Sequence, residues 1–216
     1  METELTDRIK QIKRSFRLRM NGVTSKSMRD KGIAYKINWG ISLIDLRAMA
    51  AEYGKDVALA TALWQEDIRE CKVLATLIMP AEDMSLPVAM EWSKGIKSQE
   101  IAELIAFNLF QHSLDAAAIA NELIHTNAKT AQGDKQDTLY QRIAAYQLLC
   151  RLVKQGKLQP THIQQYIYDD AAKETPATDA GLLRAIANSM MCIAEKEEDE
   201  DSKANMVLKK IGFDAF

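Results

Sequence analysis

The sequence is poor in residues that interrupt helices and in residues that build covalent or metal-bound frameworks. Only 4 prolines and 9 glycines occur in 216 residues, together with 3 cysteines and 3 histidines. The cysteines lie far apart without a C-x-x-C pair, so neither a disulfide framework nor a thiolate zinc site is indicated. The histidines lack the i, i+4 spacing of a helical metal site. We therefore expect reduced thiols, no metal and no cofactor.

Long apolar runs are also missing from the chain. None approaches the roughly 18 residues that are needed to cross a bilayer. The N-terminus, with Glu2, Glu4, Asp7, Arg8 and Lys10, is charged where a secretory signal has an apolar core. We therefore expect a cytoplasmic protein that has no membrane partner, and we expect it to be a monomer.

The composition that remains favours helices over strands. Hydrophobic residues make up 47% of the chain, which is enough for a continuous core in a protein of this length. Ala, Leu, Ile, Met, Glu, Lys and Gln dominate, and these residues have high helix propensity or fit helix surfaces well. The default expectation is one domain that spans residues 1–216.

Apolar residues recur every three or four positions in successive segments, and capping residues, glycine or proline separate these segments. Residues 21–40 lack this pattern and are expected to form a connector. The expected helices run from Leu5 to Met20, Ser42 to Gly54, Asp56 to Trp64, Glu66 to Met79, Ser85 to Gly95, Asp137 to Val153 and Ser202 to Ile211, with others beginning at Ser98, Ser113, Pro160 and Thr178.

Short paired helices with brief connections predict an all-α fold, an α-α superhelix of antiparallel helix repeats without a sheet. A globular helical bundle is the main alternative, but it requires longer and more uniform helices than this punctuation allows. Within the expected single domain, residues 1–40 form a basic N-terminal helix and connector, and residues 41–216 form the repeat body.

The charge is distributed unevenly along the chain. The first 40 residues contain ten basic and four acidic side chains, a net charge of +6, whereas the whole chain carries −2. Basic segments of this kind can bind the phosphates of DNA, and Arg14 and Arg17 are the candidates here. Many surface helices are basic without such a partner, so charge alone leaves the question open.

A series of short motifs occurs between Leu63 and Phe110. It consists of Leu63-Trp64, Ile68-Arg69-Glu70, Leu74-Ala75 and Met90-Glu91-Trp92. In order and spacing these motifs resemble the AlkD-like DNA alkylation repair family, and the resemblance extends from about Leu43 to Glu195. It implies HEAT-like helical repeats and a basic concave surface that holds duplex DNA. It also implies a DNA glycosylase that removes cationic N3- or N7-alkylated purines.

The same resemblance implies a set of site residues. The family motif S-W-D-x-x-D matches residues 98–103, where Gln99 replaces the aromatic residue and Glu103 replaces the catalytic aspartate. A second family aromatic matches Asn188, and a family arginine matches Arg142. Glu103 is therefore the candidate catalytic residue, and Arg142, Gln99 and Asn188 join Arg14 and Arg17 as candidate DNA-binding residues.

Each of these candidates also has a purely structural interpretation. Glu103 can be an exposed or salt-bridged carboxylate, and Arg142 can be the partner of a buried carboxylate. Trp64 and Trp92 are expected to pack in the core.

Two functions therefore remain: a DNA-binding repair protein with or without glycosylase activity, and a non-catalytic helical-repeat scaffold that binds a protein or nucleic acid. The side chains that line the binding surface would distinguish them.

Overall fold

The computed structural model describes residues 2–33, 35–129, 135–197, 199 and 201–213. The predicted all-α class is confirmed, because the one β-type pairing among these residues is an isolated bridge between Ile37 and Ile68. No helix within the same residues is long and apolar enough to cross a membrane. The chain divides into two compact units, residues 1–84 and 85–216. The organisation as a single domain stays a prediction.

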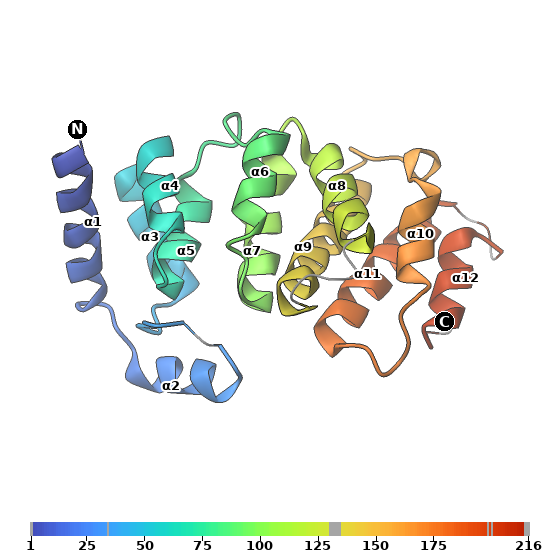
Figure 1. The fold of residues 1–216 in the computed structure, drawn as a ribbon, viewed down its shortest axis with the longest axis horizontal. Helices are drawn as coiled ribbons and strands as arrows, with labels where there is room; N and C mark the ends of the chain where they lie inside the picture. The colour runs from blue at the N-terminus through green and yellow to red at the C-terminus, as the bar shows by residue number, and fades with distance from the viewer. Residues whose placement is uncertain (1, 34, 130–134, 198, 200, 214–216) are drawn as a thin grey trace. The chain divides into compact units, whose positions relative to one another are not determined.

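Unit 1, residues 1–84, is built around the central helix α5, which packs on α3 and α4, while α1 packs on α4 (Figure 1). The predicted caps are present: Ser42 Oγ accepts a hydrogen bond from the Asp45 amide, and Asp56 accepts one from the Leu59 amide. Trp64 is 2% exposed, as expected for a core residue. The helices are α1 (Glu2–Phe16), α2 (Gly22–Asp30), α3 (Leu43–Tyr53), α4 (Val57–Trp64) and α5 (Arg69–Ile78).

The segment between α1 and α3 differs from the prediction. α1 ends at Phe16 and does not reach Met20, which is 59% exposed. The expected connector contains the helix α2. Asn21 falls at the start of the expected connector, but its side chain accepts a hydrogen bond from the Thr24 amide at 3.0 Å and so caps the start of α2. Asparagine favours this capping position, which explains the error.

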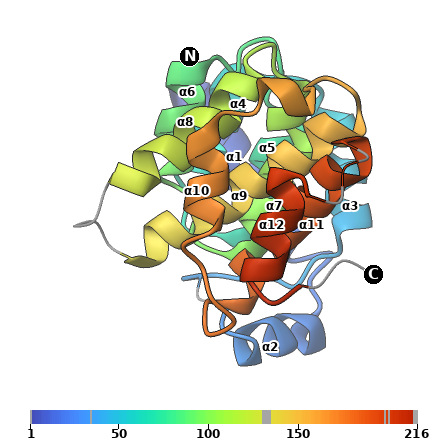
Figure 2. The same ribbon diagram turned by 90° about the vertical axis from the view of Figure 1, so that its right-hand side faces the viewer.

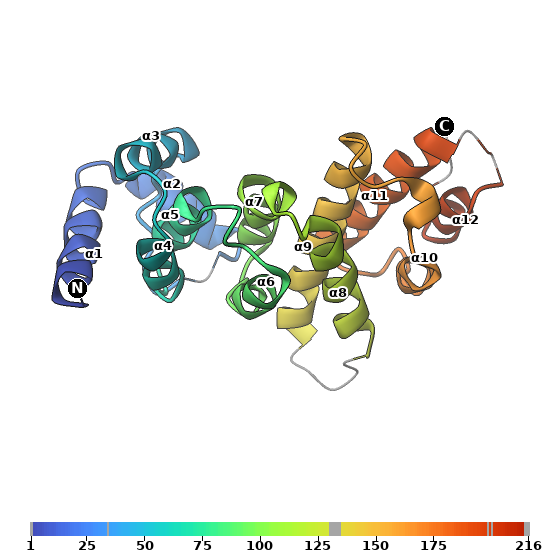
Figure 3. The same cartoon turned by 90° about the horizontal axis from the view of Figure 1, so that it is seen from above.

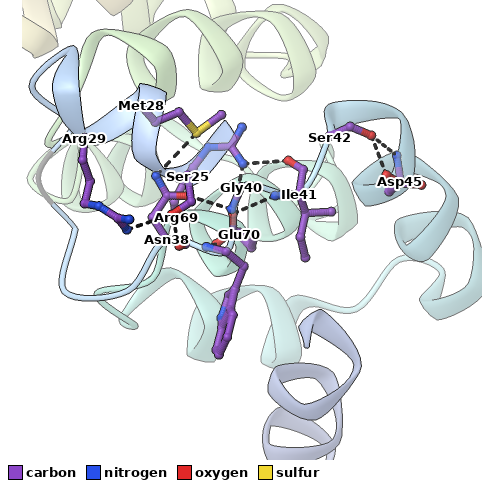
Figure 4. A network of polar contacts seen from close by, with 11 residues as sticks. Ser25, Met28, Arg29, Asn38, Gly40, Ile41, Ser42, Asp45, Arg69 and Glu70 are labelled. Atoms are coloured by element: carbon purple, nitrogen blue, oxygen red, sulfur yellow. Dashed lines mark hydrogen bonds and ion pairs between the residues drawn. The ribbon is translucent and has the colours of Figure 1, made fainter. Parts of the chain in front are cut away.

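Residues 37–41 follow α2 and are held by a buried carboxylate on α5 (Figure 4). Glu70 is 0% exposed, and its side-chain oxygens accept hydrogen bonds from the amides of Trp39 and Ile41 at 3.1 and 3.3 Å. The guanidinium of Arg69, also buried, donates to Glu70 at 3.1 Å and to the Ile41 carbonyl at 2.9 Å. The Arg69–Glu70 ion pair therefore provides hydrogen-bond partners for two backbone amides and one carbonyl that lie outside the helices.

Glycine is required at position 40 within this segment. Gly40 has a φ of 70°, in the left-handed region that favours glycine. A Cβ atom there would lie 2.3 Å from the Asn21 carbonyl oxygen and 2.6 Å from the Ser25 amide nitrogen. The missing side chain thus allows residues 37–41 to lie against the start of α2, where Ser25 Oγ donates to the Asn38 carbonyl at 2.6 Å.

Unit 2, residues 85–216, contains two layers of helices (Figure 3). α7, α9 and α11 form one layer, α6, α8 and α10 form the other, and α8 packs on α9 between them. α12 packs on α10 and α11 (Figure 2). The helices are α6 (Leu86–Ser93), α7 (Gln99–Asn108), α8 (Ala116–Lys129), α9 (Lys135–Lys154), α10 (Gln165–Ala171), α11 (Ala180–Glu197) and α12 (Lys203–Lys210), with 3-10 turns at Phe110–His112 and Pro160–His162.

The core of unit 2 follows the predicted helical register. Ile143, Tyr146 and Leu149 on α9 are each 0% exposed, and Trp92 is 4% exposed.

One helix start, that of α6, differs from the prediction. Ser85 makes no capping hydrogen bond, and the first amide of α6, that of Leu86, donates to Asp115 Oδ2 at 2.8 Å. A side chain 29 positions away therefore supplies this cap.

Replacing Glu70 by Gln should strongly destabilise unit 1. The substitution keeps the side-chain shape but leaves the Arg69 guanidinium buried without its carboxylate, which typically costs about 3–5 kcal/mol. Equilibrium unfolding in urea measures the loss. Glu52→Gln removes a carboxylate from the exposed face of α3 and should change stability by less than about 0.5 kcal/mol. Equal stabilities of the two variants would contradict this role of Glu70.

Candidate nucleic-acid interface

The two candidates on α7 are joined by a hydrogen bond one helical turn apart. Ser98 opens α7 as predicted: its Oγ accepts a hydrogen bond from the Ile101 amide at 3.3 Å and caps the helix, whose first residue is Gln99. Gln99 Nε2 donates to Glu103 Oε1 at 2.8 Å, and Glu103 is half-buried. Gln99 is therefore already engaged, and it fixes the orientation of the candidate catalytic carboxylate.

Gln99 also lies against the first turn of α11. A Cβ atom on Gly181 would lie 2.4 Å from Gln99 Oε1, so a side chain at position 181 would displace the end of the Gln99 side chain. Asp179 caps α11 by accepting hydrogen bonds from the amides of Gly181 and Leu182 at 2.9 and 3.1 Å. The predicted helix start at Thr178 is thus correct to within two residues. The first turn of α11 lies next to the start of α7.

The cation beside Glu103 is Arg151 on α9, which the sequence did not single out. Its guanidinium carbon lies 4.3 Å from the ring centroid of Phe107, one helical turn after Glu103. Burial lowers the pKa of Arg151, and the nearby Cys150 and Glu103 partly oppose this shift. No motif in the sequence links this position of α9 to α7. The α7 surface around Glu103 therefore carries one carboxylate, one amide and a partly buried arginine.

Arg142 lies nine residues before Arg151, about half a turn around α9, and points toward α10. Its Nη2 lies 2.8 Å from Asp170 Oδ2, and its Nη1 lies 2.7 Å from Glu174 Oε1. Tyr146 donates to the same Asp170 oxygen at 2.9 Å. Burial alone would lower the pKa of Arg142, but the two carboxylates outweigh this effect and raise it. The structural interpretation of Arg142 as a carboxylate partner is thus confirmed, and its contact with phosphate stays a prediction.

Asn188 lies on the exposed face of α11 together with Arg184, one turn earlier. Neither side chain forms a hydrogen bond or an ion pair with any residue that the structure describes. Both groups are therefore available to a ligand, Arg184 as a cation and Asn188 as a neutral donor and acceptor. The structure brings Gln99 and Glu103 together, whereas Arg142 belongs to a different face.

In unit 1, Arg14 near the end of α1 and Arg17, which directly follows that helix, lie in one basic hollow. We use this name for the surface pocket of about 250 Å³ that is lined by Lys10, Lys13, Arg14, Arg17, Ile37, Trp39 and Ile68. The Arg17 guanidinium lies 5.9 Å from the Trp39 ring centroid, a weak cation–π contact. Lys13 is paired with Glu66 at 2.5 Å, whereas Arg14 is exposed and has no ionic partner among the described residues.

Trp39 is the second residue of the candidate interface that the sequence reasoning missed. It falls in the segment that was expected to be a connector, so no helical periodicity indicated which way its side chain points. Its half-buried indole is brought to the basic helix α1 by the hydrogen bond from its amide to Glu70. Among the described parts of the chain, no three His, Cys, Asp or Glu side chains lie close enough together to hold a metal ion.

Comparisons with known proteins agree with this arrangement of helices. One solved structure, described as "a new family of proteins related to the HEAT-like repeat DNA glycosylases with affinity for branched DNA structures", aligns with a TM-score of 0.70. The sequence identity is 16%, and the alignment covers 94% of this chain and 83% of that chain. At this identity the likeness concerns the fold, and it confirms the predicted HEAT-like helical repeats.

The sequence comparisons give the family. No curated protein sequence matches the chain. The model of the family described as DNA alkylation repair enzyme matches residues 12–198, which is most of the 216 residues. The resemblance inferred from the motifs between Leu63 and Phe110 is thereby confirmed. The chain belongs to the DNA alkylation repair enzyme family.

Proposed function

We propose that the protein binds duplex DNA and that the basic hollow of unit 1 contacts its phosphates. The observation that carries this proposal is the convergence of four cationic side chains beside Trp39. Arg14 and Arg17 are exposed, so they can reach a phosphate without breaking an ion pair. Guanidinium groups suit this role because they donate two parallel hydrogen bonds to phosphate oxygens.

Membership of the DNA alkylation repair enzyme family supports DNA as the partner. In unit 2, we propose that Asn188 hydrogen-bonds the DNA backbone, because its side chain is exposed and forms no hydrogen bond or ion pair with described residues. Gln99 and Arg142 would first have to leave Glu103 and the carboxylates of Asp170 and Glu174. We therefore assign them smaller contributions to affinity. A cytoplasmic location and a monomeric state remain predictions.

The double variant Arg14→Ala, Arg17→Ala should bind a labelled duplex at least about tenfold more weakly at about 50 mM salt. Each phosphate contact that is lost should also reduce the slope of log affinity against log salt by about 0.9. Fluorescence anisotropy at several salt concentrations measures both quantities. A four-way junction serves as a second probe, because the structural neighbour is described as having affinity for branched DNA.

The matched control is Lys31→Ala, Lys36→Ala, which removes the same charge from exposed positions of unit 1 outside the hollow. This variant should keep most of the affinity and of the salt slope. Equal weakening by the two double variants would reject the hollow as the contact surface and indicate a general effect of charge. Arg142→Ala would break a buried ion pair, so a loss of binding in that variant could follow from lost stability.

A second function, slow excision of cationic alkylpurines, is supported by the position of Glu103. An N3- or N7-alkylated purine carries a positive charge and leaves the sugar without being protonated. The remaining requirement is a carboxylate that stabilises the oxocarbenium-like sugar. Glu103 provides this group, and the hydrogen bond from Gln99 orients it. Arg151 lies nearby and offsets part of its charge, so we expect slow excision, limited to lesions that are already cationic.

Release of N7-methylguanine and N3-methyladenine from methylated duplex DNA, at excess protein, tests this second function. The wild type should release both bases slowly, and Glu103→Gln should lose at least about 100-fold in rate while still binding DNA. Glu91→Gln, at an exposed position of α6, should behave like the wild type. If the wild type releases no base, the glycosylase role is rejected and the non-catalytic scaffold is favoured.

A further inference from the structure

Two of the three cysteines meet between helices α9 and α11. Cys150 Sγ and Cys192 Sγ lie 2.8 Å apart, although 42 positions separate the residues in the sequence. The two residues are 7% and 5% exposed, so a small molecule can reach them after slight local motion. Cys71, in unit 1, is 0% exposed and provides an internal comparison.

The surroundings of the pair stabilise a thiolate on Cys150. When Cys150 is a thiolate, the thiol of Cys192 can donate a hydrogen bond to it, and this lowers the pKa of Cys150 to about 7 against the opposing effect of burial. Lys154 and Arg151 add positive charge on the same helix, whereas Glu195 opposes them. The same hydrogen bond and burial raise the pKa of Cys192. Burial raises the pKa of Cys71 to about 12, so that thiol stays protonated.

We propose that Cys150 and Cys192 form an oxidation site, at which hydrogen peroxide produces a reversible disulfide between α9 and α11. A disulfide has a sulfur–sulfur distance of about 2.05 Å. The two sulfur atoms therefore need to approach by only roughly 0.8 Å, which side-chain rotation and a small helix shift can supply.

The reaction has two balanced steps. The Cys150 thiolate attacks one oxygen of the peroxide, the O–O bond breaks, and the hydroxide that leaves takes up a proton to form water. Cys150 is then a sulfenic acid. The Cys192 sulfur attacks the Cys150 sulfur, the S–O bond breaks, and the hydroxyl group leaves as water with the Cys192 proton. Two thiols are thus oxidised to one disulfide, and one peroxide is reduced to two waters.

The bond would tie together the ends of a segment that contains all of α10. This segment also carries Asp170, the buried partner of Arg142 on α9. A cross-link of this length reduces the conformational freedom of the unfolded chain. Oxidation should therefore make unit 2 more resistant to heat, and reduction should return it to its original stability.

The test treats the folded wild type with hydrogen peroxide, blocks the remaining thiols after denaturation, and maps the peptides by mass spectrometry. We expect a peptide pair cross-linked through Cys150 and Cys192, a mass loss of about 2 Da, and alkylation of Cys71 alone. Dithiothreitol should restore three alkylated cysteines. The midpoint of thermal unfolding should rise by several degrees on oxidation and fall again on reduction.

Cys192→Ser should give no cross-link and no rise in the midpoint, and its Cys150 should be trapped as a sulfenic acid by a cyclic 1,3-diketone. The peptide map of the wild type decides the question even if this variant folds poorly. Three alkylated cysteines after peroxide treatment would overturn the proposal. A disulfide between chains, or a sulfonic acid without a cross-link, would overturn it equally. None of these readouts depends on DNA binding.

Discussion

The buried carboxylate of Glu70 is the interaction on which the proposed interface depends. It accepts hydrogen bonds from the amides of Trp39 and Ile41, and Arg69 neutralises it at 3.1 Å. Without it, residues 37–41 would expose unpaired backbone groups at the edge of a helical unit. Because these residues are held, the Trp39 indole lies beside α1 and completes the basic hollow. A structural ion pair thus positions the surface that we propose to contact DNA.

Local features of the fold could be predicted from the sequence. The caps at Ser42, Asp56 and Ser98 and the register of α9 depend on neighbours within a few residues, which the sequence displays directly. Features that depend on distant residues could not be predicted from the sequence. The first amide of α6 bonds to Asp115, and Asn21 starts a helix whose position is fixed by contacts of Ser25 with Asn38 and of Gly40 with Asn21.

In the candidate site too, the residues could be nominated from the sequence, whereas their distant partners could not. Arg14, Arg17, Gln99 and Glu103 could be nominated from charge and from the family motif. Arg14, Gln99 and Glu103 lie on helices as expected, whereas Arg17 follows the end of α1. The partners of the two α9 arginines could not be foreseen, because α10 and α7 approach opposite faces of that helix. Arg142 consequently lies in a buried ion pair, and Arg151 is the cation near Glu103.

The indole N–H resonances of the three tryptophans report whether DNA contacts the basic hollow. Trp39 is half-buried in the basic hollow, and its Nε1 has no hydrogen-bond partner among the described residues, whereas Trp64 and Trp92 are core residues. In an NMR titration of the full chain with duplex DNA, we expect the Trp39 signal to shift in proportion to binding. The signals of Trp64 and Trp92 should stay in place. Saturable DNA binding that leaves the Trp39 signal unchanged would contradict the proposed contact of DNA with the basic hollow.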